Sequence, residues 1–277
     1  MPLIDGLPDV DGLIFDIDGT LVLGARPGGE GGRALPGALE LVETLQSRDV
    51  PLVFCTNGSS QPPRRYVEHL RAAGFAVSAR DCLTPPVVAA RMIAAHVARP
   101  RALVIGGEGI EEPLEDGGVE IVAPERWPEA NVVLVGHDRG LDAAKIEAAC
   151  QAIWAGAAFF LTSDAPSFPA RGGRAVGLSS VIGAGLAHVT GVRPRLTGKP
   201  SQAVMDAAAG MLGLDAGRVA VVGDDLALEI EMAKAAGAAS VLTLTGTSTA
   251  EDVDRRSTVD RPDLVLEDLT HLLARLG

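Results

Sequence analysis

The chain has 277 residues, enough for two domains with separate cores, and 47% of these residues are hydrophobic while only 3% are aromatic. Its formal net charge of −12 argues against nucleic acid or an anionic membrane as the main partner, because no basic surface is available to bind either. Three cysteines without metal-ligand spacing (Cys55, Cys82 and Cys150), no leader pattern and no membrane-length apolar run predict a cytoplasmic protein without a disulfide framework or zinc site.

The first predicted element is a buried strand within residues 13–21 that ends in two aspartates, Asp16 and Asp18. Strand side chains alternate faces, so both carboxylates start on one side, and Gly19 then turns the backbone away. Two carboxylates this close repel each other unless a cation or a proton lies between them. An ordinary turn with a strand-end cap is the alternative that this pair alone leaves open.

The next segments lead to a second strand with polar groups at its end. Residues 24–37 are rich in glycine and form either a flap near the site or a surface insertion. A helix at 39–45 and a strand at 51–55 follow. The strand ends in donors suited to a phosphate or a carboxylate, although a helix N-cap uses the same residue types. The residues concerned are Thr56, Asn57 and Gly58.

A second α/β unit is predicted to be inserted after the helix at 64–73. Its helices are expected at 87–98 and 143–155, and its strands at 102–105, 132–135 and 158–161. The segment 166–177 carries prolines and glycines and is predicted to be the linker that returns to the first unit. We therefore expect a first core part at 1–84, an inserted unit at 85–175 and a second core part at 176–277.

The last quarter of the chain supplies a lysine and a second pair of acids. After a helix at 179–190, Lys199 lies in a turn between Gly198 and Pro200, either as a solvated surface charge or as a charge held over an anion. A strand at 219–222 then ends in Gly223-Asp224-Asp225. The remaining predicted elements are helices at 202–212 and 226–236, strands at 239–244 and 264–266, a loop at 245–261 with room for a helical turn, and a last helix.

In a parallel sheet the carboxyl ends of all strands lie at one edge, so these polar groups are expected to meet. The carboxylates suit a hard cation such as Mg²⁺, while the lysine, hydroxyl and amide suit an anion that the cation accompanies.

The ordered set of motifs resembles the haloacid dehalogenase (HAD) superfamily of phosphohydrolases. The motifs are Asp16-x-Asp18-Gly19-Thr20, Thr56-Asn57, Gly198-Lys199-Pro200 and Gly223-Asp224-Asp225. Val-Gly-His-Asp at 135–138 and Thr-Ser-Asp at 162–164 are similar to the cap of the NagD-type, 4-nitrophenylphosphatase-like branch. The resemblance covers nearly the whole chain and implies an α/β fold: a Rossmann-like parallel sheet core with an inserted smaller α/β cap domain.

The resemblance also implies a role for each matched residue in a phosphoric monoester hydrolase. Asp16 would be the nucleophile that forms an aspartyl-phosphate, and Asp18 the general acid and base. Lys199 would neutralise charge between Asp16 and the phosphate. The implied Mg²⁺ ligands are Asp16, Asp224 and the backbone carbonyl of Asp18, and the implied phosphate-binding residues are Thr56, Asn57, Gly58 and Lys199.

Three departures from the family pattern affect specificity more than the reaction. Leu228-Glu229 replaces a Thr-Asp pair, and the extra methylene of Glu229 would move a carboxylate near the metal, so Asp225 and Glu229 are expected beyond the direct ligands. Ser163 replaces an asparagine, and the loop at 24–37 is longer.

Substrate choice is expected in the cap, because the sheet edge binds only the phosphoryl group. The candidate residues are His137, Asp138, Asp164 and Arg171. The sequence leaves the small phosphorylated substrate unidentified and a homodimer open. The alternatives are a non-hydrolytic relative, such as a phosphotransferase, and a binding or regulatory protein with a degenerate HAD site.

Overall fold

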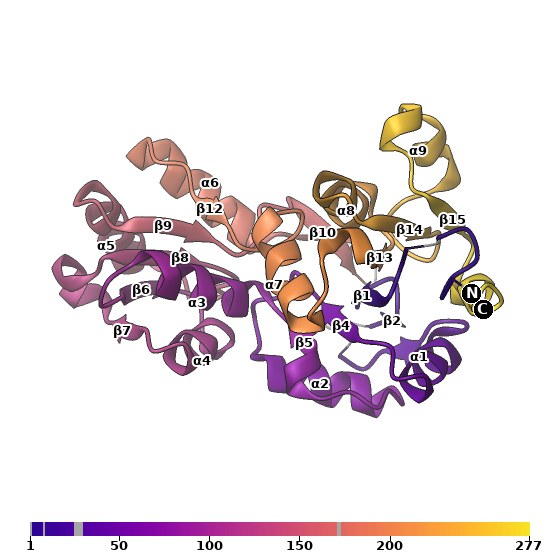
Figure 1. Cartoon of the computed structure of the whole chain (residues 1–277). Helices are drawn as coiled ribbons and strands as arrows, with labels where there is room; N and C mark the ends of the chain where they lie inside the picture. The colour runs from indigo at the N-terminus through magenta and orange to yellow at the C-terminus, as the bar shows by residue number, and fades with distance from the viewer. Residues whose placement is uncertain (1, 8, 25–29, 171–172) are drawn as a thin grey trace.

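The protein has two lobes, each built on a parallel sheet (Figure 1). The computed structural model describes residues 2–7, 9–24, 30–170 and 173–277. The core lobe contains a six-stranded sheet in the order β15-β14-β13-β1-β4-β5, and the cap lobe a five-stranded sheet in the order β12-β9-β8-β6-β7. The predicted α/β core with an inserted smaller α/β cap is confirmed.

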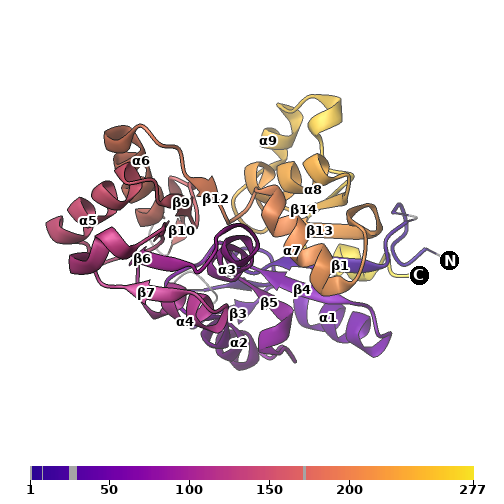
Figure 2. The same cartoon turned by 60° about the vertical axis from the view of Figure 1, so that its left-hand side comes forward.

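The core lobe is assembled from both ends of the chain (Figure 2). Its sheet strands are β1 (Gly12–Asp16), β4 (Leu52–Cys55), β5 (Cys82–Leu83), β13 (Val219–Gly223), β14 (Ala239–Thr243) and β15 (Leu264–Leu266). Its helices are α1 (Ala38–Ser47), α2 (Pro63–Ala72), α7 (Gln202–Leu212), α8 (Glu231–Ala236), α9 (Ala250–Asp254) and α10 (Leu269–Leu273). All neighbouring strands of this sheet pair in parallel, so their carboxyl ends lie at one edge.

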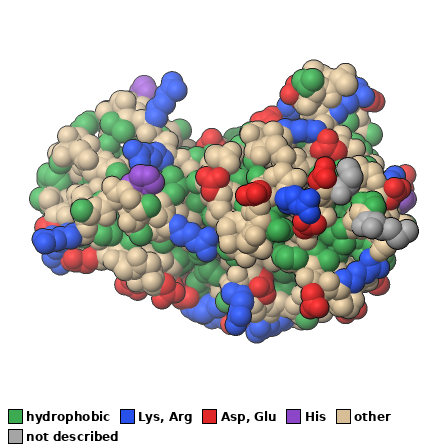
Figure 3. All heavy atoms as spheres, viewed as in Figure 1, with side chains coloured by type: hydrophobic (Ala, Val, Ile, Leu, Met, Phe, Trp, Pro, Cys, Tyr) green, Lys and Arg blue, Asp and Glu red, His purple; other side chains and the backbone are tan. Residues whose placement is uncertain are grey.

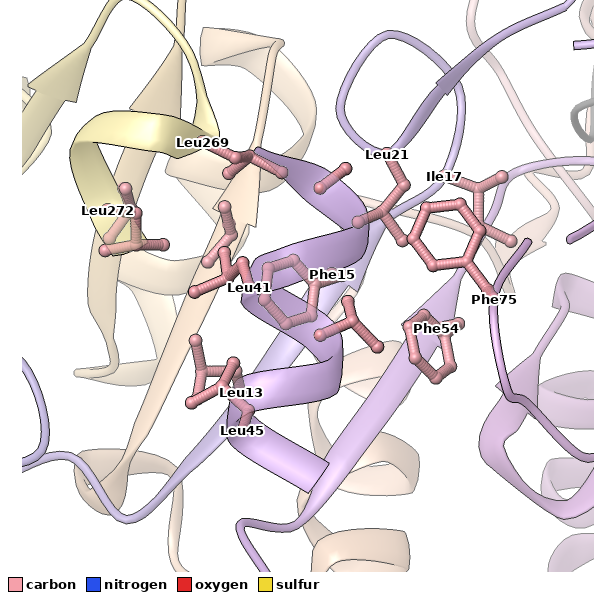
Figure 4. Packing of buried hydrophobic residues seen from close by; sticks show 14 of the residues in the cluster. Leu13, Phe15, Ile17, Leu21, Leu41, Leu45, Phe54, Phe75, Leu269 and Leu272 are labelled. Atoms are coloured by element: carbon pink, nitrogen blue, oxygen red, sulfur yellow. The ribbon is translucent and has the colours of Figure 1, made fainter. Parts of the chain in front are cut away.

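The central strand β1 is buried on both faces, which explains its continuous apolar sequence. Leu13 and Phe15 pack with α1 and α10 on one face, where the Phe15 ring stacks on Phe54 at 6.3 Å between centroids (Figure 4). Ile14 points the other way and packs with residues of α7 and α8. Helices on both faces therefore fix the end of β1, where Asp16 lies.

The cap lobe has the same layered construction. Its strands are β6 (Arg101–Ile105), β7 (Glu120–Val122), β8 (Val132–Val135), β9 (Ala158–Leu161) and β12 (Arg195–Leu196), and all neighbours are parallel. Helices α5 (Ala143–Trp154) and α6 (Leu178–Thr190) pack on one face, and α3 (Pro85–His96) and α4 (Glu108–Asp116) on the other. None of the described helices has the length and apolarity needed to cross a membrane.

The chain leaves the cap later than the sequence predicts. The expected linker at 166–177 contains the antiparallel hairpin of β10 (Ser167–Ala170) and β11 (Gly173–Val176). Helix α6 and strand β12 then stay with the five-stranded sheet, so the expected return at residue 176 precedes the point where the chain leaves the cap. Strand β12 has two residues, too few to produce a periodic signal.

Two other segments need comment. The segment 24–37, expected to be a flap or a surface insertion, includes residues 25–29, which lie outside the described part of the chain; β2 (Val22–Leu23) and β3 (Arg33–Ala34) pair on either side of them. The helix predicted from residue 226 begins with a π-helical turn at Leu226–Ile230, before α8.

Candidate active site

The predicted polar residues converge at the carboxyl edge of the core sheet. Asp16 ends β1 and is paired in register with Cys55 at the end of β4, so Thr56 follows directly beside it. Asp224 follows β13, the neighbour of β1 on the other side. Lys199, three residues after β12, reaches this edge from the junction of the two lobes.

Lys199 is the centre of the charge arrangement. Its side chain is 2% exposed, and its Nζ lies 2.5 Å from Asp16 Oδ1 and 2.6 Å from Glu229 Oε1. Burial disfavours the charged form, but the carboxylates of Asp16 and Glu229 outweigh it and raise the pKa of Lys199 well above its ordinary value. The lysine is therefore an ammonium ion held between two buried carboxylates.

Glu229 lies next to Lys199, a contact that the sequence did not predict. Its Oε2 accepts a hydrogen bond from the backbone N–H of Asp225 at 3.1 Å, so both carboxylate oxygens have partners on the chain. Burial raises the pKa of Glu229, and Lys199 opposes this rise. Asp225 accepts from the N–H of Ala227 at 2.8 Å and caps the π-helical turn. This turn, together with the extra methylene of glutamate, brings the carboxylate to the lysine.

Asp224 is held by the loop that follows β14. Its Oδ2 accepts a hydrogen bond from the N–H of Thr247 at 2.6 Å. A Cβ at Gly246 would lie 1.9 Å from this oxygen, so only glycine permits the approach. Burial and the Asp16 carboxylate raise the pKa of Asp224 to about 7. The sequence placed residues 245–261 in a loop but gave no signal that this loop contacts the site.

The donors around Asp16 fit a magnesium ion. Asp16 Oδ2 is buried and has no hydrogen-bond partner within the described part of the chain, a costly state that a bound cation would relieve. No three His, Cys, Asp or Glu side chains of the described residues form a ready metal cage. Mg²⁺ does not need one, because it binds through one or two carboxylates and keeps waters and phosphate oxygens as its other ligands. Asp16 and Asp224 supply two carboxylates at this edge, and the predicted ligation by the Asp18 carbonyl stays a prediction.

Asp18 and Thr56 connect the loop that follows β1 with the loop that follows β4. Thr56 Oγ1 donates to Asp18 Oδ2 at 3.5 Å and accepts from the N–H of Gly58 at 3.0 Å. Asp18 is partly exposed, whereas Asp16 is buried. The two aspartates thus differ in environment, because Asp18 is the more exposed of the two.

Asn57 is brought to the site but faces the protein backbone. Its Oδ1 accepts from the N–H of Lys199 at 2.7 Å, and its Nδ2 donates to the carbonyl of Lys199 at 3.1 Å. The predicted contact of Asn57 with a phosphoryl group stays a prediction.

The cap residues predicted to select the substrate have different surroundings. Asp138 is buried, and its carboxylate accepts hydrogen bonds from Lys145 Nζ at 2.7 Å and from the N–H of Gly140 at 2.6 Å. Its carboxylate oxygens therefore bind residues of the cap itself. His137 is partly buried, and burial together with Arg139 lowers its pKa. Asp164 is exposed, and Arg171 lies outside the described residues.

Ser59 joins the two lobes and was not among the predicted site residues. Its buried hydroxyl accepts from the backbone N–H of His137 at 3.1 Å and from Thr162 Oγ1 at 3.2 Å. The carboxyl ends of β8 and β9 therefore meet the loop that follows β4. The first contact joins residues that are 78 positions apart in the chain, and the second joins residues that are 103 positions apart. No local sequence pattern predicts contacts of this kind. Seen as a solid surface, the molecule is hollowed between the lobes (Figure 3).

The chain matches a sequence family described as haloacid dehalogenase-like hydrolase over residues 13–120 and a HAD-hydrolase-like family over residues 196–272. A 5′-nucleotidase of Bacillus subtilis is 30% identical over 94% of this chain and 96% of its own. The structure of a p-nitrophenyl phosphatase from Archaeoglobus fulgidus is 32% identical with a TM-score of 0.86, covering 97% and 100% of the two chains. A Mycobacterium tuberculosis glycerol phosphate phosphatase, solved with magnesium, is 29% identical with a TM-score of 0.84, covering 96% of this chain and 77% of the other.

Proposed function

Because this chain belongs to the haloacid dehalogenase-like hydrolase family and is a phosphatase, we propose that it hydrolyses a small phosphorylated metabolite with Mg²⁺ through an aspartyl-phosphate on Asp16. The observation that carries the proposal is how the two carboxylate oxygens of Asp16 are surrounded. One carboxylate oxygen is fixed by Lys199, and the other is buried with no partner among the described residues. The lysine orients the group, and the second oxygen is left without a protein partner for the attack on phosphorus.

Asp16 and Asp18 divide the chemical work. One oxygen of Asp16 forms a bond to phosphorus while the ester bond to the leaving oxygen breaks, and Asp18 gives that oxygen a proton. Asp18 then takes a proton from water, the water oxygen attacks phosphorus, and the bond to Asp16 breaks. Phosphate leaves and both carboxylates return to their first state.

The remaining residues hold charge in place during both steps. The Lys199 ammonium stays beside Asp16 and offsets the negative charge that the phosphoryl group brings. Thr56 and the backbone of Gly58 lie on the loop that follows β4 and are assigned to the phosphoryl group, and Ser59 of the same loop bonds to the cap. When bound by Asp16, Asp224 and the Asp18 carbonyl, Mg²⁺ would neutralise charge on the phosphoryl oxygens.

The substrate is proposed to be a small phosphate monoester whose organic part meets the cap. The relatives named above act on nucleotides, nitrophenyl phosphate and glycerol phosphate. Nucleoside monophosphates, glycerol phosphate, sugar phosphates, phosphoglycolate and pyridoxal phosphate are therefore the compounds to test. His137 is the predicted cap residue whose partly buried position at the lobe junction suits contact with the substrate.

A screen of these phosphorylated metabolites and an aryl phosphate, with phosphate detection, tests the proposal. We expect phosphate release that needs Mg²⁺ and stops with a chelator. Transfer of the phosphoryl group to an added alcohol without phosphate release would favour the phosphotransferase alternative. No turnover of any ester, with the protein folded, would favour a binding or regulatory protein.

Replacing Gly246 by alanine is expected to weaken magnesium binding. The new Cβ would collide with Asp224 Oδ2 and displace a proposed ligand. Loss of support for a metal ligand typically costs about 10- to 100-fold in affinity, so the Mg²⁺ concentration for half-maximal activity should rise by that factor. Gly210→Ala is the matched control, because Gly210 lies in α7 with no atom near its Cβ position. Equal magnesium requirements in the Gly246→Ala protein and the wild type would contradict the assignment of Asp224.

A further inference from the structure

We propose that Asn57 is a positioning residue that holds Lys199 in place, an inference that rests on the proposed function of the site. The side-chain amide of Asn57 forms a two-bond clamp on the backbone of Lys199. Its Oδ1 accepts the Lys199 N–H at 2.7 Å, and its Nδ2 donates to the Lys199 carbonyl at 3.1 Å. An amide is suited to this task because it combines an acceptor with a donor on one rigid group.

The clamp is closely fitted. A Cβ at Gly198 would lie 2.7 Å from Asn57 Oδ1 and 2.2 Å from the carbonyl oxygen of Thr162. Glycine at this position therefore lets the lysine segment lie against both the loop after β4 and the end of the cap strand β9. The amide of Asn57 is directed at this segment.

Lys199 needs such a support because its segment begins in the cap lobe. The preceding strand β12 belongs to the cap sheet, and Thr197 donates its N–H to the Leu161 carbonyl at 2.9 Å. The nucleophile Asp16, in contrast, ends a strand of the core sheet. A displacement of one lobe relative to the other would move the ammonium away from Asp16 unless the segment is also tied to the core.

The chain itself joins the core where α7 begins at Gln202, and Asn57 adds a side-chain tie at Lys199 itself. Asn57 follows β4, whose last residue Cys55 is in register with Asp16. The clamp thus fixes the Lys199 backbone to the strand beside the nucleophile, and the ammonium stays 2.5 Å from Asp16. Asn57 therefore acts on catalysis through Lys199 instead of through the phosphoryl group.

A role in positioning Lys199 and a role in binding the phosphoryl group predict different results for Asn57→Ala. A positioning role predicts a fall in kcat of about 100-fold, the cost of misplacing a catalytic group by about 1 Å. KM for an aryl phosphate and inhibition by inorganic phosphate should change less than about threefold, since the amide does not touch the ligand. Hydrogen exchange of the Lys199 amide, measured by mass spectrometry, should become faster because its acceptor is lost.

Asn131→Ala is the matched control. Asn131 also clamps backbone, with Oδ1 on the N–H of Arg101 at 2.8 Å and Nδ2 on the carbonyl of Arg99 at 3.2 Å, but it lies in the cap away from the site. It should lower stability by a similar amount and leave kcat unchanged. The double-variant cycle with Lys199→Ala adds a second comparison, in which the Asn57 substitution should cause no further loss once Lys199 is absent.

Three results would overturn the inference: a rise in KM and in the phosphate inhibition constant with kcat unchanged, a full additional loss in the Lys199→Ala background, or unchanged exchange of the Lys199 amide. If the wild type hydrolyses no ester, the proposed function fails, and the exchange measurement still decides the role of Asn57. If Asn57→Ala does not fold, Asn57→Asp keeps the acceptor and loses the donor. It should retain the exchange protection and lower kcat, and loss of protection there would also contradict the clamp.

Discussion

The Asp16→Asn protein is expected to release phosphate at least about 10⁴-fold more slowly than the wild type, because loss of a nucleophile removes the covalent step. The amide has nearly the same shape as the carboxylate and can still accept a hydrogen bond from Lys199 Nζ, which Glu229 also holds. Folding should therefore be preserved while attack on phosphorus is lost. The measurement is steady-state phosphate release from an aryl phosphate at saturating Mg²⁺.

Asp206→Asn is the control for this substitution, because Asp206 is an exposed carboxylate of α7 that accepts a bond from the exposed side chain of Gln202. It should keep full activity. Unfolding temperatures of both variants should stay close to the wild type. Full turnover by the folded Asp16→Asn protein would remove Asp16 from the mechanism.

Replacing Lys199 with methionine is expected to leave only a small residual activity and to lower the free energy of unfolding by about 3–5 kcal/mol, the cost of removing one partner of a buried ion pair. Methionine fills similar space but leaves the carboxylates of Asp16 and Glu229 buried without their cation. Glu229→Gln in the same protein removes one of these charges. The double variant should therefore recover part of the lost stability without recovering the lost activity.

The stability of the Lys199→Met protein should also depend on pH. Burial raises the folded-state pKa of Glu229 above the ordinary value of 4.5, and this variant lacks the lysine that opposes the rise. The folded state then binds a proton more tightly than the unfolded chain, so stability falls as pH rises from 4.5 through the raised folded pKa. Chemical denaturation across this window measures the effect. A Lys199→Met protein as stable as the wild type at all pH values would contradict the buried ion-pair arrangement.

The positions of Asp16 and Asp224 followed from the sequence for a physical reason. Both come directly after apolar runs that form buried parallel strands, and the geometry of a parallel sheet brings such ends to one edge. The same argument included Lys199, and the motif resemblance then implied the role of this lysine beside Asp16. The core strands and most helices carried strong apolar patterns, and the structure contains them.

The contacts of Asn57, Ser59 and Glu229 could not be predicted in the same way. Each depends on the direction of one side chain toward a residue far away in the chain, and propensity and periodicity carry no information about that direction. The contact of Glu229 further depends on a π-helical turn where the sequence predicts a regular helix. Strand β12 is too short for a pattern, so the attachment of the lysine segment to the cap was also missed.

If Asp16 carries the phosphoryl group during the reaction, chemical trapping in the Asp18→Asn protein should reveal the phosphorylated residue. An aryl leaving group departs without an acid, while hydrolysis of the intermediate needs Asp18 as base, so the phosphorylated enzyme should accumulate. Borohydride converts an aspartyl-phosphate to homoserine, which mass spectrometry locates in the peptide. We predict homoserine at position 16. If the wild type releases phosphate but homoserine is found at another position, or at none, Asp16 is not the residue that carries the phosphoryl group.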